Sequence, residues 1–218
     1  MNADGSAVYP ARYPAKSGDF TISTFAEELE FIKDLNTDSG RQVGIYPEIK
    51  RPEWHREEGI DIAPGFLKAI MDVGYEKFDD PVYIQCFNFA ELRRLKAEFD
   101  CPFKLVQLIG ENSWGEAEID FDYLRTAIGI VELAKTVDAI GPWIPHLYEL
   151  TEKNPRPGRL IQHAHAAGLA VHPYTFRADE LPPGFSSFEE LVRFFVFDIG
   201  VDGLFTDFPD RVVELRLP

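Results

Sequence analysis

The feature that most constrains the fold is a regular alternation of helix and strand patterns, from residue 24 to the end of the 218-residue chain. Apolar residues at helical spacing alternate with short apolar runs, and glycine or proline stands at many junctions. Helices are expected at 25–32, 62–73, 89–99, 123–136, 157–167, 188–199 and 212–217, and strands at 43–49, 82–87, 103–109, 137–140, 169–175 and 202–206. Strands that alternate with helices form parallel sheets through right-handed crossovers, so the pattern predicts an α/β protein.

Three of the expected helices begin with a capping signature. A Thr, Asn or Ser precedes the helix and a Glu follows three residues later, so that side chains satisfy free backbone NH groups of the first turn. The pairs are Thr24 with Glu27, Asn88 with Glu91, and Ser187 with Glu190. The signature supports the helical interpretation of these three segments.

Two architectures satisfy the alternation, an open doubly wound sheet and a (β/α)8 TIM barrel. No glycine-rich phosphate loop follows any expected strand. Polar side chains instead follow nearly every expected strand, which suits a barrel mouth fed by many strands better than a single crevice. These residues are Glu48 and Lys50, Gln85 and Asn88, Trp143 and His146, His172, Tyr174 and Arg177, and Asp207. The sequence therefore predicts a barrel.

The barrel pattern is incomplete at its start. A TIM barrel has eight strands and about 250 residues, whereas this chain offers six expected strands and opens on a helix. We therefore expect one domain over 1–218 that corresponds to strands 3–8 of an N-terminally truncated barrel. Residues 1–23 are expected to form an irregular lead-in.

Charge and composition exclude several classes of function. A formal net charge of −15 argues against nucleic acid and anionic membranes as partners, because both require patches of Lys and Arg. The two cysteines form neither a disulfide framework nor a zinc motif. No apolar run is long enough to span a membrane, and residues 1–10 lack the features of a signal peptide. If Met1 is the natural start, we expect a cytoplasmic protein.

Four segments carry a resemblance to a known family. They are GIYPEIK at 44–50, YIQCF at 83–87, GLAVHPYT at 168–175 and GVDGLFTDFP at 200–209. In this order and spacing, the chain resembles glycerophosphodiester phosphodiesterases, and most closely their larger periplasmic branch, over roughly residues 12 to 215. The resemblance covers almost the whole chain.

The resemblance implies a (β/α)8 barrel that hydrolyses glycerophosphodiesters to sn-glycerol 3-phosphate and an alcohol with Ca²⁺ or Mg²⁺. In the family, two histidines act as acid and base, and three carboxylates hold the metal. The His-Arg-Gly, Glu-x-Asp and His-Asp segments that supply both histidines and two carboxylates do not occur in this chain. The third carboxylate carries over to Glu48, and a phosphate-contacting lysine carries over to Lys50. For a full-length protein, the resemblance implies a periplasmic or secreted location.

Glu48 and Lys50 also suit this chemistry by residue type. Hydrolysis of a phosphodiester requires neutralisation of a non-bridging oxygen, and a hard cation on carboxylate oxygens supplies it. Strand alternation places Glu48 and Lys50 on one face, so that both can point into the mouth. The alternative is an ordinary ion pair beyond a strand end.

Four further strand-end residues are candidates for substrate contact. Gln85 is expected to hydrogen-bond the substrate or a carboxylate just outside the metal ligands, and Trp143 to form the floor of the glycerol pocket. His172 and Tyr174 fall where the family has a substrate-lining aromatic segment. Simple packing is the alternative for Trp143, and a buried structural histidine is the alternative for His172. Asp207 is expected to cap the closing helix rather than to bind metal.

Three functions remain open on the sequence. The first is a metal-dependent phosphodiesterase whose longer form carries the missing histidines. The second is a non-catalytic binding or remnant protein, because this chain has one of the three metal carboxylates and neither histidine. The third is a related phospholipase that cuts choline or inositol phosphodiesters. The expected partner is a small glycerophosphodiester, without nucleic acid or stable membrane insertion, and the chain alone is expected to be inactive.

Overall fold

The computed structural model of the protein describes residues 2–10, 12, 21–152 and 154–215. Its helices are α1 (Phe25–Ser39), α2 (Pro52–Glu57), α3 (Ile62–Asp72), α4 (Phe89–Glu98), α5 (Phe121–Leu124), α6 (Ala127–Leu133), α7 (Leu160–Ala166), α8 (Phe188–Arg193) and α9 (Pro209–Glu214). Its strands are β1 (Tyr83–Cys86), β2 (Lys104–Ile109), β3 (Ala139–Pro142), β4 (Tyr148–Thr151), β5 (Asn154–Pro157) and β6 (Ala170–Val171). Two short 3₁₀ turns, η1 (Asn112–Trp114) and η2 (Ile144–Leu147), and the π-helical segment η3 (Phe194–Ile199) complete the described part.

The main sheet is parallel, and its strands follow the order of the chain, β1-β2-β3-β6. An extended segment flanks it on each side. The segment 44–50 pairs in parallel with β1 through bridges of Ile45 with Val82 and of Glu48 with Gln85. The segment 202–207 pairs in parallel with the chain beyond β6 through the bridge of Phe176 with Thr206. The predicted α/β fold with a parallel sheet is confirmed.

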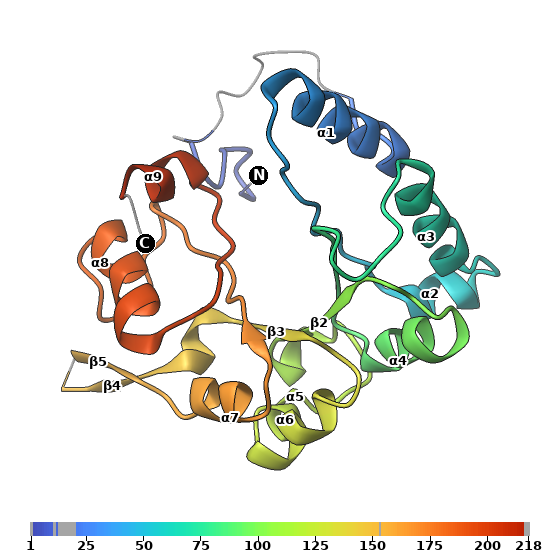
Figure 1. The fold of residues 1–218 in the computed structure, drawn as a ribbon. Coiled ribbons are helices and arrows are strands. Elements are labelled where there is room, and N and C mark those ends of the chain that lie inside the picture. Colours follow the sequence, from blue (N-terminus) through green and yellow to red (C-terminus); the bar gives the residue numbers. More distant parts are fainter. Residues whose placement is uncertain (1, 11, 13–20, 153, 216–218) are drawn as a thin grey trace.

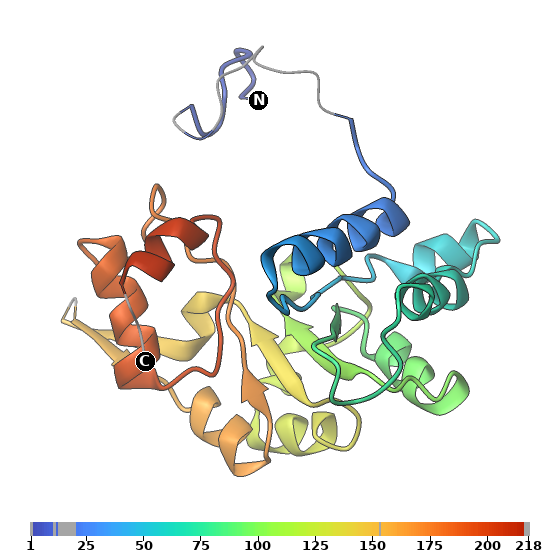
Figure 2. The same cartoon turned by 45° about the horizontal axis from the view of Figure 1, so that its top comes forward.

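The helices lie around the outside of the strands, and the ring that they form is open on one side (Figure 1). The opening lies between α1 and α9 (Figure 2). Among the described residues, no backbone bridge joins the segment 44–50 to the segment 202–207. Side chains contact each other across the opening, because the ring of Tyr46 meets that of Phe205 edge-on at 4.7 Å. The described sheet is therefore an open barrel.

The three capping signatures form as predicted. Thr24 and Glu27 make a complete capping box at the start of α1. The Asn88 side chain accepts from the backbone NH of Glu91 at 3.0 Å, and the Ser187 hydroxyl accepts from that of Glu190 at 3.1 Å. Local sequence signals were sufficient here because each cap involves residues only three apart.

The expected single helix at 123–136 is wrong, because the chain forms α5 and α6 in its place. Asp120 caps α5 by accepting from two backbone NH groups, and Thr126 caps α6 by accepting from that of Gly129. The two helices pack so closely that a Cβ at Gly129 would lie 2.2 Å from the Tyr123 carbonyl oxygen. A second capping residue thus divides the apolar pattern.

The expected helix at 157–167 starts later, at Leu160, since β4 (148–151) and β5 (154–157) pair as antiparallel strands before it. Pro157 would suit the first position of a helix, but here it pairs with Tyr148 across β4 and β5. The expected strands 43–49 and 202–206 are extended segments joined by isolated bridges, because each lies at an open edge with a neighbour on one side. The closing helix α9 begins at Pro209 rather than residue 212, and residues 216 and 217 of that prediction lie outside the described residues.

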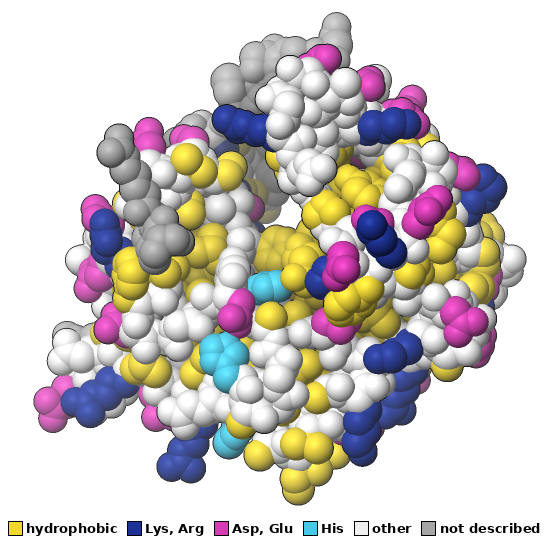
Figure 3. All heavy atoms as spheres, viewed as in Figure 1, with side chains coloured by type: hydrophobic (Ala, Val, Ile, Leu, Met, Phe, Trp, Pro, Cys, Tyr) yellow, Lys and Arg dark blue, Asp and Glu magenta, His cyan; other side chains and the backbone are white. Residues whose placement is uncertain are grey.

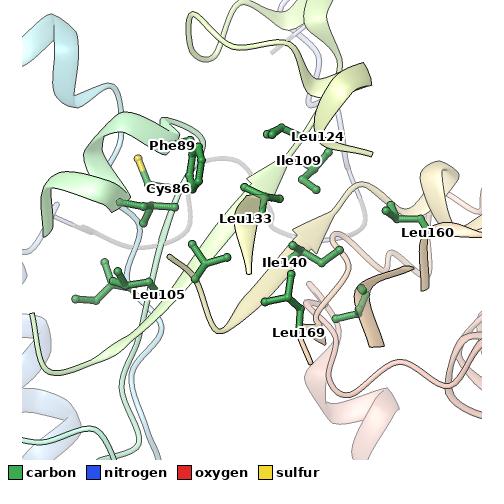
Figure 4. Close-up of a cluster of buried hydrophobic side chains, with 14 of the residues drawn as sticks. Cys86, Phe89, Leu105, Ile109, Leu124, Leu133, Ile140, Leu160 and Leu169 are labelled. Atoms are coloured by element: carbon green, nitrogen blue, oxygen red, sulfur yellow. The ribbon is translucent and has the colours of Figure 1, made fainter. Parts of the chain in front are cut away.

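The core lies between the strands and the outer helices (Figure 4). Leu105 and Ile140 from the sheet pack with helix residues such as Leu133, and all three are at most 2% exposed. Burial of such side chains stabilises the folded protein by about 25 cal/mol for each Å² of apolar surface removed from water. Cys86 belongs to this core, and its burial raises the pKa of the thiol to about 12. The core fixes the strands that lead to the mouth.

Among the described residues, no helix has the length and apolarity needed to cross a bilayer.

Candidate active site

A cavity of about 390 Å³ lies at the carboxyl ends of the parallel strands. Figure 3 shows the hollow on this face of the molecule, with hydrophobic side chains at its floor. The residues that line it are Glu48, Lys50, Gln85, Phe87, Leu108, Trp114, Glu116, Tyr174, Thr175, Phe205, Thr206 and Asp207. We call this space the mouth cavity. Four of the six predicted site residues line it, namely Glu48, Lys50, Gln85 and Tyr174.

Glu48 and Lys50 lie next to each other in the mouth cavity. Lys50 Nζ is 3.2 Å from Glu48 Oε1, and the side chains are 64% and 25% exposed respectively. Despite this proximity, Glu48 Oε1 is buried and has no hydrogen-bond partner in the described structure. The Lys50 ammonium group is its ion-pair partner, and the oxygen keeps a lone pair with which it can accept from a ligand or bind a cation.

Gln85 and Tyr174 form the neighbouring part of the mouth cavity. Gln85 Nε2 lies 3.4 Å from the Tyr46 carbonyl, which is a weak hydrogen bond. The Tyr174 hydroxyl donates to the Ile109 carbonyl at 3.0 Å. Burial raises the pKa of Tyr174, with nearby carboxylates adding to the effect. Tyr174 therefore stays protonated and contributes an aromatic wall.

His172 lies one layer deeper in the barrel than Tyr174. It is buried, with Nδ1 2.9 Å from the Tyr46 hydroxyl, and its ring meets the edge of Tyr83 at 5.4 Å. We call Tyr46, Tyr83 and His172 the aromatic layer. Each precedes a mouth residue by two positions, so strand alternation places both layers on the same inner face. Burial lowers the pKa of His172, so the ring is neutral near pH 7.

Trp143 does not line the mouth cavity. Its ring contacts that of Trp114 at 5.2 Å, and it lines a separate cavity of about 580 Å³ with Tyr148 and Arg177. On the other side it meets His146 edge-on at 5.5 Å. Trp114, rather than Trp143, is the tryptophan that lines the mouth cavity.

The sequence patterns did not identify Trp114 and Glu116 as site residues. Both follow β2, whose carboxyl end faces the same mouth as the other strands. The argument that polar and aromatic residues beyond strand ends form the site would have included 110–116. Their η1 turn has no capping residue with a side-chain hydrogen bond, so no local signal marked it.

The prediction that Asp207 caps the closing helix is wrong. The N-cap of α9 is Phe208, and no side chain caps that helix. Asp207 Oδ2 instead accepts from Arg12 Nη1 at 2.6 Å and from Arg177 Nε at 3.1 Å. Arg12 also makes two hydrogen bonds of 2.7 Å to Asp179, which lower the pKa of that carboxyl group. Two guanidinium groups therefore neutralise Asp207 at the rim.

A buried ion pair holds the helix that follows Lys50. Glu91 on α4 is fully buried and hydrogen-bonds Arg56 on α2, while Arg94 lies 3.5 Å away. Asn88 adds a 2.8 Å hydrogen bond to Glu53. Since α2 begins two residues after Lys50, these contacts determine where the end of the segment 44–50 lies.

The described residues contain no group of three or more His, Cys, Asp or Glu side chains arranged to hold a metal ion. Glu48 Oε1, which pairs with Lys50 but makes no hydrogen bond, could serve as one ligand of a hard cation, because Ca²⁺ and Mg²⁺ prefer carboxylate oxygens.

Comparison with known proteins identifies close relatives. The model of the "Glycerophosphoryl diester phosphodiesterase family" matches residues 3–211. The chain is 37% identical over 224 residues to a glycerophosphodiester phosphodiesterase from Haemophilus influenzae, and the match covers 95% of this chain and 62% of the relative. A glycerophosphodiester phosphodiesterase from Treponema pallidum is 31% identical, with 95% and 63% covered. The chain thus spans about three-fifths of the length of the curated relatives it matches.

Solved structures show a similar fold. A crystal structure from Silicibacter pomeroyi, assigned as a glycerophosphoryl diester phosphodiesterase, superimposes with a TM-score of 0.67 at 19% identity, covering 97% of this chain and 63% of that one. A phosphodiesterase from Oleispira antarctica, in complex with the product sn-glycerol-3-phosphate, gives a TM-score of 0.51 at 17% identity, covering 86% and 60%. These likenesses support the fold, and the family match extends over nearly the whole chain. The chain belongs to the glycerophosphoryl diester phosphodiesterase family.

Proposed function

We propose that the protein hydrolyses glycerophosphodiesters to sn-glycerol 3-phosphate and an alcohol with the help of a divalent cation, Ca²⁺ or Mg²⁺. The observation that carries the proposal is the pair in the mouth cavity, in which Lys50 lies beside a Glu48 oxygen that lacks a hydrogen bond. The names of the Haemophilus and Treponema relatives support this reaction class. The product bound to the Oleispira protein is a further parallel.

In this reaction a water oxygen forms a new bond to phosphorus, and the bond from phosphorus to the alcohol oxygen breaks. The departing alkoxide takes up a proton. When bound, the cation neutralises a non-bridging phosphate oxygen, and Glu48 is its proposed ligand in this chain. Lys50 places an ammonium group against the phosphate. Phe87 and Tyr174 limit water at the reacting centre from one side of the cavity.

Proton transfer needs groups that the mouth cavity does not show, because no histidine lines it among the described residues. In the family these groups belong to His-Arg-Gly and His-Asp segments. The open side of the sheet, between 44–50 and 202–207, is where strands that carry such segments would pair. The described residues form six parallel segments in chain order, whereas a complete barrel has eight strands. This difference supports the placement.

A second candidate function is binding of glycerophosphodiesters without hydrolysis. The absence of a histidine from the lining of the mouth cavity, among the described residues, is the observation that favours it. Residues 1–218 would then bind sn-glycerol 3-phosphate but release no alcohol. Turnover by these residues at the rate of a longer form of the protein would exclude this candidate.

The test is the substitution Glu48→Gln, which keeps the shape of the side chain and removes its charge. In a longer form of the protein that turns over substrate, we expect turnover of glycerophosphocholine to fall by about 10²-fold at limiting Ca²⁺ or Mg²⁺, because one anionic ligand is lost. Partial recovery at saturating metal is expected for the same reason. The matched control is Glu98→Gln, an exposed carboxylate on α4. Activity of Glu48→Gln that equals the wild type at limiting metal would refute the assignment.

A further inference from the structure

The charges that line the mouth cavity do not by themselves suit an anionic ligand. Three carboxylates line it, those of Glu48, Glu116 and Asp207, and Lys50 is the one cation among the described residues of the lining. A round space of about 390 Å³ is roughly 9 Å across, so an anion inside it lies within about one Debye length of all four charges. A phosphate therefore binds well only where part of this negative charge is neutralised.

The N-terminal segment supplies part of that neutralisation. We call residues 2–10 and 12 the strap. Arg12 donates from Nη1 to Asp207 at 2.6 Å, and from Nε and Nη2 to Asp179 in two hydrogen bonds of 2.7 Å. The two bonds to Asp179 form a bidentate pair, which is a strong and directional contact for an arginine. These contacts join residues that are 167 and 195 positions apart in the sequence.

Aromatic rings hold the guanidinium group of Arg12 in place. It lies 4.1 Å from the centroid of the Tyr9 ring and 5.1 Å from that of Phe208. The Tyr9 hydroxyl donates to Glu180 at 2.8 Å and accepts from Arg177 at 3.2 Å. The strap is therefore attached to the rim at two points, and the Arg12 side chain is only 25% exposed.

The strap lies at the opening of the sheet, at the level of the mouth. Its partners follow the carboxyl ends of the last two parallel segments, beyond Phe176 and Thr206. The chain later reaches Thr24, which caps the start of α1 on the other side of the opening. Figures 1 and 2 show the strap between α9 and the start of α1. Most of its residues are exposed, so it can detach without unfolding the sheet.

Attachment of the strap changes the charge of the rim. With the strap attached, the guanidinium groups of Arg12 and Arg177 face three carboxylates, those of Asp179, Glu180 and Asp207. With the strap detached, Arg177 alone faces the same carboxylates. An anion in the mouth cavity then meets one more uncompensated negative charge at the rim. Attachment of the strap and binding of an anion are therefore linked.

We propose that the strap is a detachable part of the phosphate site. Arg12 raises the affinity of the mouth for an anionic ligand, and the bound anion in turn holds the strap on the rim. Arg12 acts through Asp207, so it is a positioning residue rather than a catalytic one. The expected effect on Kd is about threefold, the scale of one unit charge at about 8 Å near a protein surface. The identity of the ligand rests on the proposed function, whereas attachment of the strap is measured without a ligand.

Cleavage of residues 1–218 by trypsin after Arg12 reports the attachment. The protease must take the guanidinium group out of its contacts, so the rate follows the detached fraction. We expect Asp179→Asn to raise this rate about tenfold, because the bidentate pair is lost. Asp38→Asn, at an exposed carboxylate of α1, is the matched control and should leave the rate unchanged. Equal rates for Asp179→Asn and the wild type would overturn the proposal.

The ligand should act back on the strap. Saturating sn-glycerol 3-phosphate should slow cleavage after Arg12 about threefold, the factor by which loss of Arg12 weakens its binding, because linkage is reciprocal. Uncharged glycerol at the same concentration should leave the rate unchanged, and sodium chloride at equal ionic strength is the salt control. A rate that sn-glycerol 3-phosphate does not change relative to the salt control would contradict the coupling.

Calorimetry of sn-glycerol 3-phosphate binding measures the other side of the linkage. Arg12→Gln should weaken binding about threefold, and Arg12→Lys, which keeps the charge and loses the bidentate contact, should lie between it and the wild type. Arg41→Gln is the matched control, because it makes the same change of net charge at the amino end of the segment 44–50. Affinity of Arg12→Gln equal to that of the wild type would refute the role of the strap.

One further variant separates this proposal from the proposed function. Lys50→Ala should weaken binding of sn-glycerol 3-phosphate both in the wild type and in Arg12→Gln, since Lys50 contacts the phosphate itself. Loss of the Lys50 effect alone would contradict the proposed phosphate site and leave the contribution of the strap intact. Loss of the Arg12 effect alone would contradict the strap and leave the proposed function intact.

Discussion

At the scale of single residues, the contact between His172 and Tyr46 joins the two sides of the open sheet. Tyr46 lies on the segment 44–50, and its hydroxyl is 2.9 Å from His172 Nδ1, just beyond β6. The backbone of Gly203 packs closely against the His172 ring, because a Cβ atom at position 203 would lie only 2.9 Å from His172 Cδ2. This enclosure favours a neutral imidazole, since a charged ring would lose its hydration.

The pH dependence of stability follows from this burial. The pKa of His172 is lowered in the fold, so below the unfolded value of about 6.5 the unfolded chain binds the proton more readily. The contribution of neutral His172 to the free energy of unfolding is therefore fully present above about pH 6.5. It is lost as the pH falls from that value toward the lower pKa of His172 in the folded protein. We expect urea midpoints to fall between about pH 7 and pH 5.

His146 contributes in the same direction, because burial also lowers its pKa. Replacement of either residue, as His172→Gln or His146→Gln, should flatten the profile, and the double variant should flatten it most. A profile with the wild-type slope in the double variant would contradict this explanation.

The residues of the site were predictable in part. The rule that chemistry lies beyond strand ends led to Glu48, Lys50, Gln85 and Tyr174, which share one cavity. It could not tell how deep a residue lies, because His172 and Tyr174 have the same alternation and differ only by one layer. Nor could it tell that Trp114 takes the place beside the cavity, since that depends on packing over Gly110.

At the scale of elements, the contact between α2 and α4 shows how tertiary contacts stabilise a short helix whose N-cap residue gives no capping signal. The N-cap of α2 is Arg51 in a left-handed conformation, with φ 46°, and its side chain makes no capping bond. The six-residue helix is stabilised instead by tertiary contacts with Glu91 and Asn88. Short helices are marginal on their own, so Pro52 at the first helical position is a signal too weak to predict this one without the tertiary contacts.

The ion pair at this contact should be worth more than a surface pair. Arg56→Ala leaves the fully buried Glu91 with only the more distant Arg94, at a cost of about 2 kcal/mol in the free energy of unfolding. Arg93→Ala is the matched control on α4, because Arg93 pairs with Glu132 at the surface, and it should cost about 0.5 kcal/mol. Chemical denaturation measures both, and equal losses would show that burial adds nothing here.

At the scale of the whole molecule, the open side of the sheet determines which backbone groups lack partners. Along the segment 44–50, the NH groups of Ile45 and Ile49 donate to carbonyls beside β1, at 2.9 and 3.0 Å. Those of Tyr46 and Glu48 face the opening and have no backbone partner among the described residues. The sequence predicted six strands in order, but this geometry arises only when the edge strands are placed in space.

Hydrogen exchange should report this alternation directly. We expect the amides of Ile45 and Ile49 to exchange about 10²-fold more slowly than those of Tyr46 and Glu48. Val106, in the middle of the sheet, is the internal reference for a protected amide. Protection of Tyr46 and Glu48 equal to that of their neighbours would mean that a further strand covers this edge in solution. Residue-resolved mass spectrometry or NMR can make the measurement.

The direction of the two open edges limits what can close them. Both flanking segments run parallel to the four strands between them. A hairpin that entered the opening would present one strand in the wrong direction, because its two strands are antiparallel. A filling that keeps the sheet parallel therefore needs a strand, an outer crossover and a second strand, which takes about 30 residues or more. Closure adds a helix to the outside of the ring between α1 and α9, and a short peptide cannot substitute for it (Figure 1).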